Sequence, residues 1–98
     1  MIVVDHAPAD WFLLRDEDRY LLDINCSISA AGFSILLLLS ATEHAAVLAD
    51  RHGACAQLAA QFRARPHDYA ARDGSEVHGT HVLAAVQTWR AAGSMAAG

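Results

Sequence analysis

Six histidines make a metal centre the first chemistry to consider in this sequence. His78 and His81 are three positions apart, so a helix would place both imidazoles on one face. A zinc site needs three or four ligands at characteristic local spacings. The remaining donors have no such spacing to this pair: His44, His52, His67 and Glu76. We therefore predict no metal site and no cofactor, and we keep a metal-binding protein or small enzyme that uses His78 and His81 as a third hypothesis.

The two cysteines, Cys26 and Cys55, are the candidates for thiol chemistry. A reactive cysteine needs an electropositive, partly exposed setting, often at the N-terminus of a helix. The surrounding pattern instead places Cys26 within a strand and Cys55 within a helix, each at a core-facing position. Two widely separated cysteines are also too few for the disulfide framework of a small secreted protein. Both are therefore interpreted as reduced thiols that fill the core.

The densest group of carboxylates is the run Asp16-Glu17-Asp18. A calcium loop spaces its oxygen ligands and has a glycine at the bend, and this run has neither feature. General acid–base catalysis needs carboxylates held in a fixed geometry with shifted pKa values, which a short turn does not provide. The chain also contains no glycine-rich phosphate loop and no dinucleotide-binding motif. We therefore expect a solvated turn here, no catalytic residues, and a protein that is not an enzyme.

Length and charge exclude further classes of function. The chain has 98 residues, enough for one domain, and a net charge of −4 in which all seven basic residues are arginines. It lacks the basic surface that binds nucleic acids or anionic membranes. The uncharged stretch 24–42 is densely apolar only over Phe33–Leu39, which suits a strand and is too short for a membrane span. Because no cationic, apolar leader begins the sequence, the predicted location is the cytoplasm.

The apolar periodicity predicts an antiparallel three-stranded meander. Its strands are expected at Trp11–Arg15, Arg19–Ile28 and Phe33–Ser40, with a loop of three to five residues around the acidic run. Met1–Val4 is a candidate for a short N-terminal edge strand. Alternate residues of the second and third strands form a uniformly apolar face, the predicted core: Leu22, Ile24, Cys26, Ile28, Phe33, Ile35, Leu37 and Leu39.

Two helices are predicted after the meander. The first spans Thr42–Ala64, with its first residue as the N-cap and Gly53 in its interior. The second runs over about 76–92, and residues 94–98 are expected to form a disordered tail. Packing both helices against the apolar face of the sheet gives an α+β fold, with residues 1–98 forming a single small domain.

The opposite face of the sheet is the predicted functional surface. If both helices cover the core face, this second face stays open, with aromatic, leucine and arginine side chains among short polar ones, as in protein interfaces. Ser27 and Ser34 contribute to its polar part. Together with the acidic tip, the predicted partner-binding residues are Trp11, Leu13, Arg15, Asp16, Glu17, Asp18, Asp23, Asn25, Leu36 and Leu38.

Besides the hypothesis of a metal-binding protein or small enzyme that uses His78 and His81, two classes of function that use this face remain open. The first hypothesis is a non-catalytic protein-binding domain, such as a small acidic bacterial inhibitor or immunity-type protein that covers a basic partner. The second is a homodimer that associates through the same open face. A further alternative for this face is structural, because the second helix would bury it if the helix crossed to that side of the sheet.

Overall fold

The computed structural model describes residues 1–8, 10–26, 33–65, 68–69 and 72–97, and within them it confirms the predicted α+β class. The sheet contains β1 (Ile2–Ala7), β2 (Trp11–Asp16), β3 (Arg19–Cys26) and β4 (Phe33–Leu38), paired antiparallel in chain order. The helices of the described ranges are α1 (Ala41–Ala49), α2 (Arg51–Ala64) and α4 (Ser75–Ala97). The candidate edge strand is therefore a full fourth strand. The predicted continuation of β3 through residues 27–28 lies outside the described residues.

The face assigned to Trp11 and Leu13 from the sequence is wrong. Trp11 pairs with Ile24 and Leu13 with Leu22, and residues directly opposite each other in an antiparallel pair share a face. Both side chains therefore lie in the main core beneath α1 and α2, where Trp11 is only 1% exposed. The reason is the β2–β3 turn, which has two residues, 17 and 18, between the paired Asp16 and Arg19. A loop with an odd number of residues would place every β2 side chain on the opposite face of the sheet. An error of one residue in the predicted loop length therefore reverses the faces of the whole strand.

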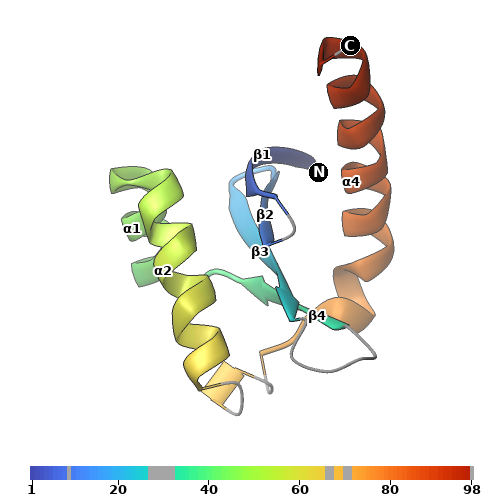
Figure 1. Ribbon diagram of the computed structural model, residues 1–98. Helices are drawn as coiled ribbons and strands as arrows, with labels where there is room; N and C mark the ends of the chain where they lie inside the picture. The colour runs from blue at the N-terminus through green and yellow to red at the C-terminus, as the bar shows by residue number, and fades with distance from the viewer. Residues whose placement is uncertain (9, 27–32, 66–67, 70–71, 98) are drawn as a thin grey trace.

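The second face of the sheet is not open, because α4 covers it. Figure 1 shows α1 and α2 on one side of the sheet and α4 on the other. A second apolar cluster forms between the sheet and this helix from Leu14, Leu21, Leu36, Val82, Ala85 and Val86. The prediction that both helices pack on one face is therefore wrong, and the crossing of the second helix gives a three-layer α/β/α arrangement. A sheet apolar on both faces needs cover on both.

The predicted helix over 42–64 consists of two helices that meet at Asp50. The N-cap of α1 is Ser40 instead of Thr42, because the Ser40 hydroxyl accepts from the Glu43 N–H at 3.3 Å and the Glu43 carboxylate accepts from the Ser40 N–H at 2.9 Å. Asp50 ends α1 and caps α2, its carboxylate accepting from the Gly53 N–H at 3.3 Å. A Cβ at residue 53 would lie 2.2 Å from Asp50 Oδ2, so Gly53 makes room for this cap.

The outer ends of the chain are more regular than the sequence pattern indicates. β1 extends to Ala7 and stops before Pro8, which has no N–H to donate to the sheet. α4 continues to Ala97, where the sequence predicts a disordered tail from residue 94. Gly93 disfavours a helix by about 1 kcal/mol relative to alanine, and the alanines around it, the best helix formers, oppose that effect.

The cap at Asp50 predicts non-additive effects of two substitutions. Asp50→Ala is expected to lower the free energy of unfolding by about 1 kcal/mol, because the α2 N-cap is lost. Gly53→Ala alone is expected to be near neutral, since the displaced cap offsets a gain in helix propensity of about 1 kcal/mol. Added to Asp50→Ala, the same glycine substitution should stabilise the protein. Urea denaturation of the unmodified protein, the two single variants and the double variant measures these changes in unfolding free energy. Additive changes would contradict the prediction.

The three-layer arrangement predicts that two neighbouring leucines differ sharply in their contribution to stability. Leu36 is 2% exposed beneath α4, whereas Leu38 is 40% exposed. Leu36→Ala should lower the free energy of unfolding by about 2–5 kcal/mol, and Leu38→Ala by less than about 1 kcal/mol. Chemical denaturation at constant pH measures both. Equally small losses would mean that α4 does not cover this face.

Candidate protein-binding groove

The two edges of the sheet differ in how their backbone groups are satisfied. Beyond β4, the chain returns at Asp73 and Gly74: the Leu36 N–H donates to Asp73 Oδ1 at 3.1 Å, and the Gly74 N–H donates to the Leu36 carbonyl at 2.7 Å. This segment closes the β4 edge and leads directly into α4. In the described residues, β1 pairs with β2 on one side and with no strand on the other. β1 is therefore the open edge.

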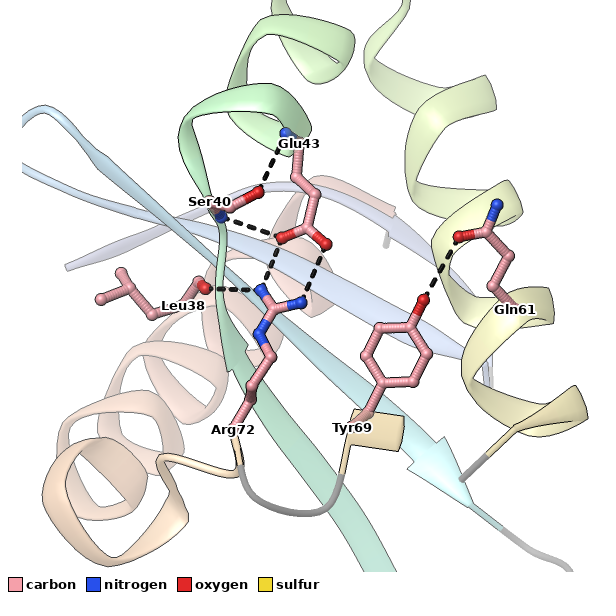
Figure 2. Close-up of polar contacts among 6 residues, drawn as sticks. All are labelled: Leu38, Ser40, Glu43, Gln61, Tyr69 and Arg72. Atoms are coloured by element: carbon pink, nitrogen blue, oxygen red, sulfur yellow. Dashed lines mark hydrogen bonds and ion pairs between the residues drawn. The ribbon is translucent and has the colours of Figure 1, made fainter. Parts of the chain in front are cut away.

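An ion pair holds the segment before α4 in place (Figure 2). The Arg72 guanidinium donates to both carboxylate oxygens of Glu43, at 2.6 and 3.0 Å, and to the Leu38 carbonyl at 3.1 Å. Hydrogen bonding to Arg72 lowers the pKa of Glu43, and the same bond raises the pKa of Arg72. Nearby, the Tyr69 hydroxyl donates to Gln61 Oε1 at 3.3 Å. The start of α4 is thereby tied to β4 and to the N-terminus of α1.

A groove of about 580 Å³ lies between α4 and the open edge strand β1. One helix is about 10–12 Å across, whereas four strands at about 4.8 Å spacing span roughly 15 Å between the outer strand axes, so one helix leaves part of the face uncovered. The lining side chains come from the first residues of the chain, the end of β2 and one flank of α4: Met1, Ile2, Val3, Asp16, His81, Ala84, Ala85, Thr88, Trp89 and Ala92.

The walls of this groove are mainly apolar, with a few polar groups. Asp16 has the one side chain of its lining with a formal charge when histidine is neutral, and its carboxylate pairs with Arg19 at 2.8 Å while staying 29% exposed. Trp89 forms the aromatic part of the wall and makes edge contacts with the rings of His6, at 4.5 Å, and Phe12, at 5.3 Å. These contacts from β1 and β2 fix the indole, so this wall is preorganised.

A second, smaller groove of about 270 Å³ lies on the other flank of α4. Asp23, Phe12 and Arg90 are among its lining, and the Arg90 guanidinium lies 5.7 Å from the Phe12 ring centroid. One of its walls is α4, and the other consists of residues of β2, β3 and β4. Because the Leu36 backbone is paired with Asp73 and Gly74, this groove offers no free strand edge. We therefore regard the β1–α4 groove as the candidate site.

The predicted partner-binding residues do not form one surface. Trp11, Leu13 and Leu36 are buried in the two cores and cannot contact a partner in this structure. Asp16 and Asp23 line different grooves. The others are exposed but scattered: Arg15, Glu17, Asp18, Asn25 and Leu38.

Most groove residues were missed by the sequence reasoning. Apart from Asp16, they come from the first three residues of the chain and from positions 81–92 of α4, and only the packing of the fold brings these distant segments together. Trp89 is half-buried, because one part of its ring contacts His6 and Phe12 and another part lines the groove. The composition of Met1, Ile2 and Val3 indicated a strand but not its open edge.

The structure gives little support to metal or thiol chemistry. Among the described residues, no three histidine, cysteine, aspartate or glutamate side chains lie close enough together to hold a metal ion. His81 lines the groove, and His78 is partly buried next to Gly74. Burial raises the pKa of the Cys55 thiol to about 12, so this group stays protonated at neutral pH and is a poor nucleophile. The Cys26 side chain lies outside the described part.

Comparisons with known proteins identify no family for this chain. No protein-family model matches the sequence, and searches of curated proteins and of solved structures found no match. In the part of the chain that the structure describes, no helix combines the length and apolarity needed to cross a bilayer. The function is therefore inferred from the chain itself.

The Glu43–Arg72 pair predicts a pH-dependent contribution to stability. Because the pKa of Glu43 is lowered on folding from its ordinary 4.5, the pair stabilises the protein fully above that value and less as the pH falls through the lowered pKa. Glu43→Gln should cost about 0.5–1.5 kcal/mol near neutral pH, since the pair is partly exposed. The difference in unfolding free energy between Glu43→Gln and the unmodified protein should shrink as the pH falls below 4.5.

Denaturation curves of both proteins between neutral pH and pH of about 3 measure this difference. Arg72→Met removes the same pair and should reproduce the same trend with pH. A difference that stays constant over the whole range would show that Glu43 stabilises the protein without its charge.

Proposed function

We propose that this chain is a non-catalytic protein-binding domain that holds a segment of a partner protein in the groove between β1 and α4. The observation that carries the proposal is the contrast between the two edges of the sheet. The β4 edge is closed by Asp73 and Gly74, whereas the β1 edge borders an apolar groove. Apolar surface next to unpaired strand edges is a common feature of protein recognition sites.

The character of the groove favours a protein partner over a small molecule. Small-molecule sites are concave and enclose most of their ligand. This groove is partly open to solvent and lined by Met1, Ile2, Trp89 and small helix residues, and aromatic residues and methionine are enriched at protein interfaces. Ile2 is 51% exposed at its rim, an apolar side chain that a partner would cover.

The charge of the chain favours a basic partner. The net charge is −4, and the exposed Glu17 and Asp18 follow Asp16 at the end of the groove. Complementary charge accelerates encounter and excludes acidic competitors. A small inhibitor or immunity-type protein that covers a basic surface has this combination of small size and acidic charge, and we propose that role in preference to self-association.

The proposal predicts that filling the groove blocks binding. Thr88 is exposed in the groove lining, and the neighbouring Gln87 is exposed but about 100° away around the helix, outside both grooves. Peptides enriched from a random displayed library should bind the unmodified protein and Gln87→Arg alike, and should bind Thr88→Arg at least about tenfold more weakly. Calorimetric titration measures the affinities, and the two variants carry the same added charge.

Two results would overturn the proposal. One is equal affinity of the enriched peptides for both variants, which would place binding elsewhere, and the other is the absence of any enriched peptide. Sedimentation of the free protein tests whether the chain associates with a second copy of itself. A dimer that Thr88→Arg dissociates and Gln87→Arg leaves intact would identify a second copy of this chain as the partner and would replace the proposed heterologous one.

A further inference from the structure

We infer that the partner segment binds in an extended conformation and adds to the sheet as a fifth strand beside β1. This inference rests on the proposed function and specifies the chemistry of the ligand. The segment is a strand of another protein in which every second side chain is apolar, with a basic residue at the end that lies near Asp16. The backbone of β1, the flank of α4 and the charge of the groove each support one part of it.

The backbone of β1 supplies the hydrogen-bonding groups. A strand at the edge of a sheet presents a row of N–H and C=O groups that an added strand can pair with. β1 also contains a bulge between Val3 and Asp5, where Val4 is the extra residue opposite β2. The bulge interrupts regular pairing, and the groove lies on its N-terminal side, along residues 1–3. A short segment can therefore add there, while a long flat edge that invites aggregation is avoided.

The pleat of β1 determines which side chains of an added strand enter the groove. Val3 pairs with Leu14 and packs with the α4 cluster, whereas Asp5 pairs with Leu13 and its carboxylate contacts Arg51 and His52 on the α2 side. A fifth strand would continue this alternation. Its side chains in line with Val3 would meet the flank of α4 at Ala85 and Trp89, and they must be apolar. Its other side chains would face away from α4.

The charge at the end of the groove predicts a basic residue at one end of the added strand. Asp16 lies where β2 ends next to the first residues of β1, as Ile2 pairs with Arg15. Its partner Arg19 is half exposed, and the exposed Glu17 and Asp18 continue the acidic tip. A lysine or arginine of the added strand at this end would pair with Asp16. The bound segment is thus an alternating apolar strand with a basic end.

The test uses the tightest-binding peptide from the selection described above, synthesised with blocked termini and titrated into isotope-labelled full-length protein. Strand addition should produce nuclear Overhauser contacts between the peptide backbone and residues 1–4, and amide exchange in β1 should slow. Asp16→Asn should weaken binding about three- to fivefold, as expected for a partly exposed ion pair. Asp68→Asn, exposed on the surface and outside the groove lining, removes the same charge and is the matched control, which should leave the affinity unchanged.

The outcomes separate this inference from the proposed function. If Thr88→Arg weakens binding but the peptide binds as a helix, or makes no backbone contacts with β1, strand addition is wrong and the groove remains the binding site. Equal effects of Asp16→Asn and Asp68→Asn would overturn the basic end of the segment. If Thr88→Arg and Gln87→Arg bind alike, the groove itself is excluded and both proposals fail.

Discussion

The attachment of Asp73 and Gly74 to the edge of β4 is the constraint on which the rest of the structure depends. It carries the chain from the α2 side of the sheet round β4 to the α4 side, so that both apolar faces receive a cover. The same attachment closes one edge of the sheet and leaves the other to β1. Since Arg72 joins this segment to Glu43 and to the Leu38 carbonyl, the first turn of α4 starts from a fixed point. The layer order, the closed edge and the groove all follow from this crossing.

The two apolar layers are unequal, and this inequality explains why the groove lies beside α4. The layer beneath α1 and α2 contains Trp11, Phe62 and most of the large buried side chains, whereas the layer beneath α4 has three strand leucines and three small helix residues. Regions with fewer buried apolar contacts open more readily than a large core. α4 is thus the more loosely packed cover, and the space that it leaves over β1 is a surface that another chain can fill.

The polar interactions of this protein join helices to strands at the rims of the layers and contribute little inside the core. No polar or charged residue of the described part is fully buried, and the ion pairs lie at the rims of the layers. Arg63 illustrates the pattern, because it joins the C-terminal half of α2 to Asp10 and to the Asn25 carbonyl at the ends of two strands. Recognition by a strand edge fits such a protein, since backbone groups bind a partner without any motif in the sequence.

The sequence alone determined the class of the fold, the strands and most of the helical residues, because these depend on periodicity over neighbouring positions. It also indicated the buried thiol at Cys55. It could not determine which side of β2 faces α1 and α2. That choice depends on whether the β2–β3 turn has two or three residues. The N-cap was predicted at Thr42, because Ser40 was assigned to the third strand, although serine is also a favoured N-cap residue.

Only the tertiary structure decided the side of the sheet that α4 covers, and with it the candidate site. The residues of the groove come from the two ends of the chain, and their apolar side chains were consistent with burial in either layer. Periodicity shows that a helix has an apolar stripe but not the face against which it packs. That choice was made by the hydrogen bonds of Asp73 and Gly74 to β4, a contact between positions 37 residues apart that no local pattern encodes.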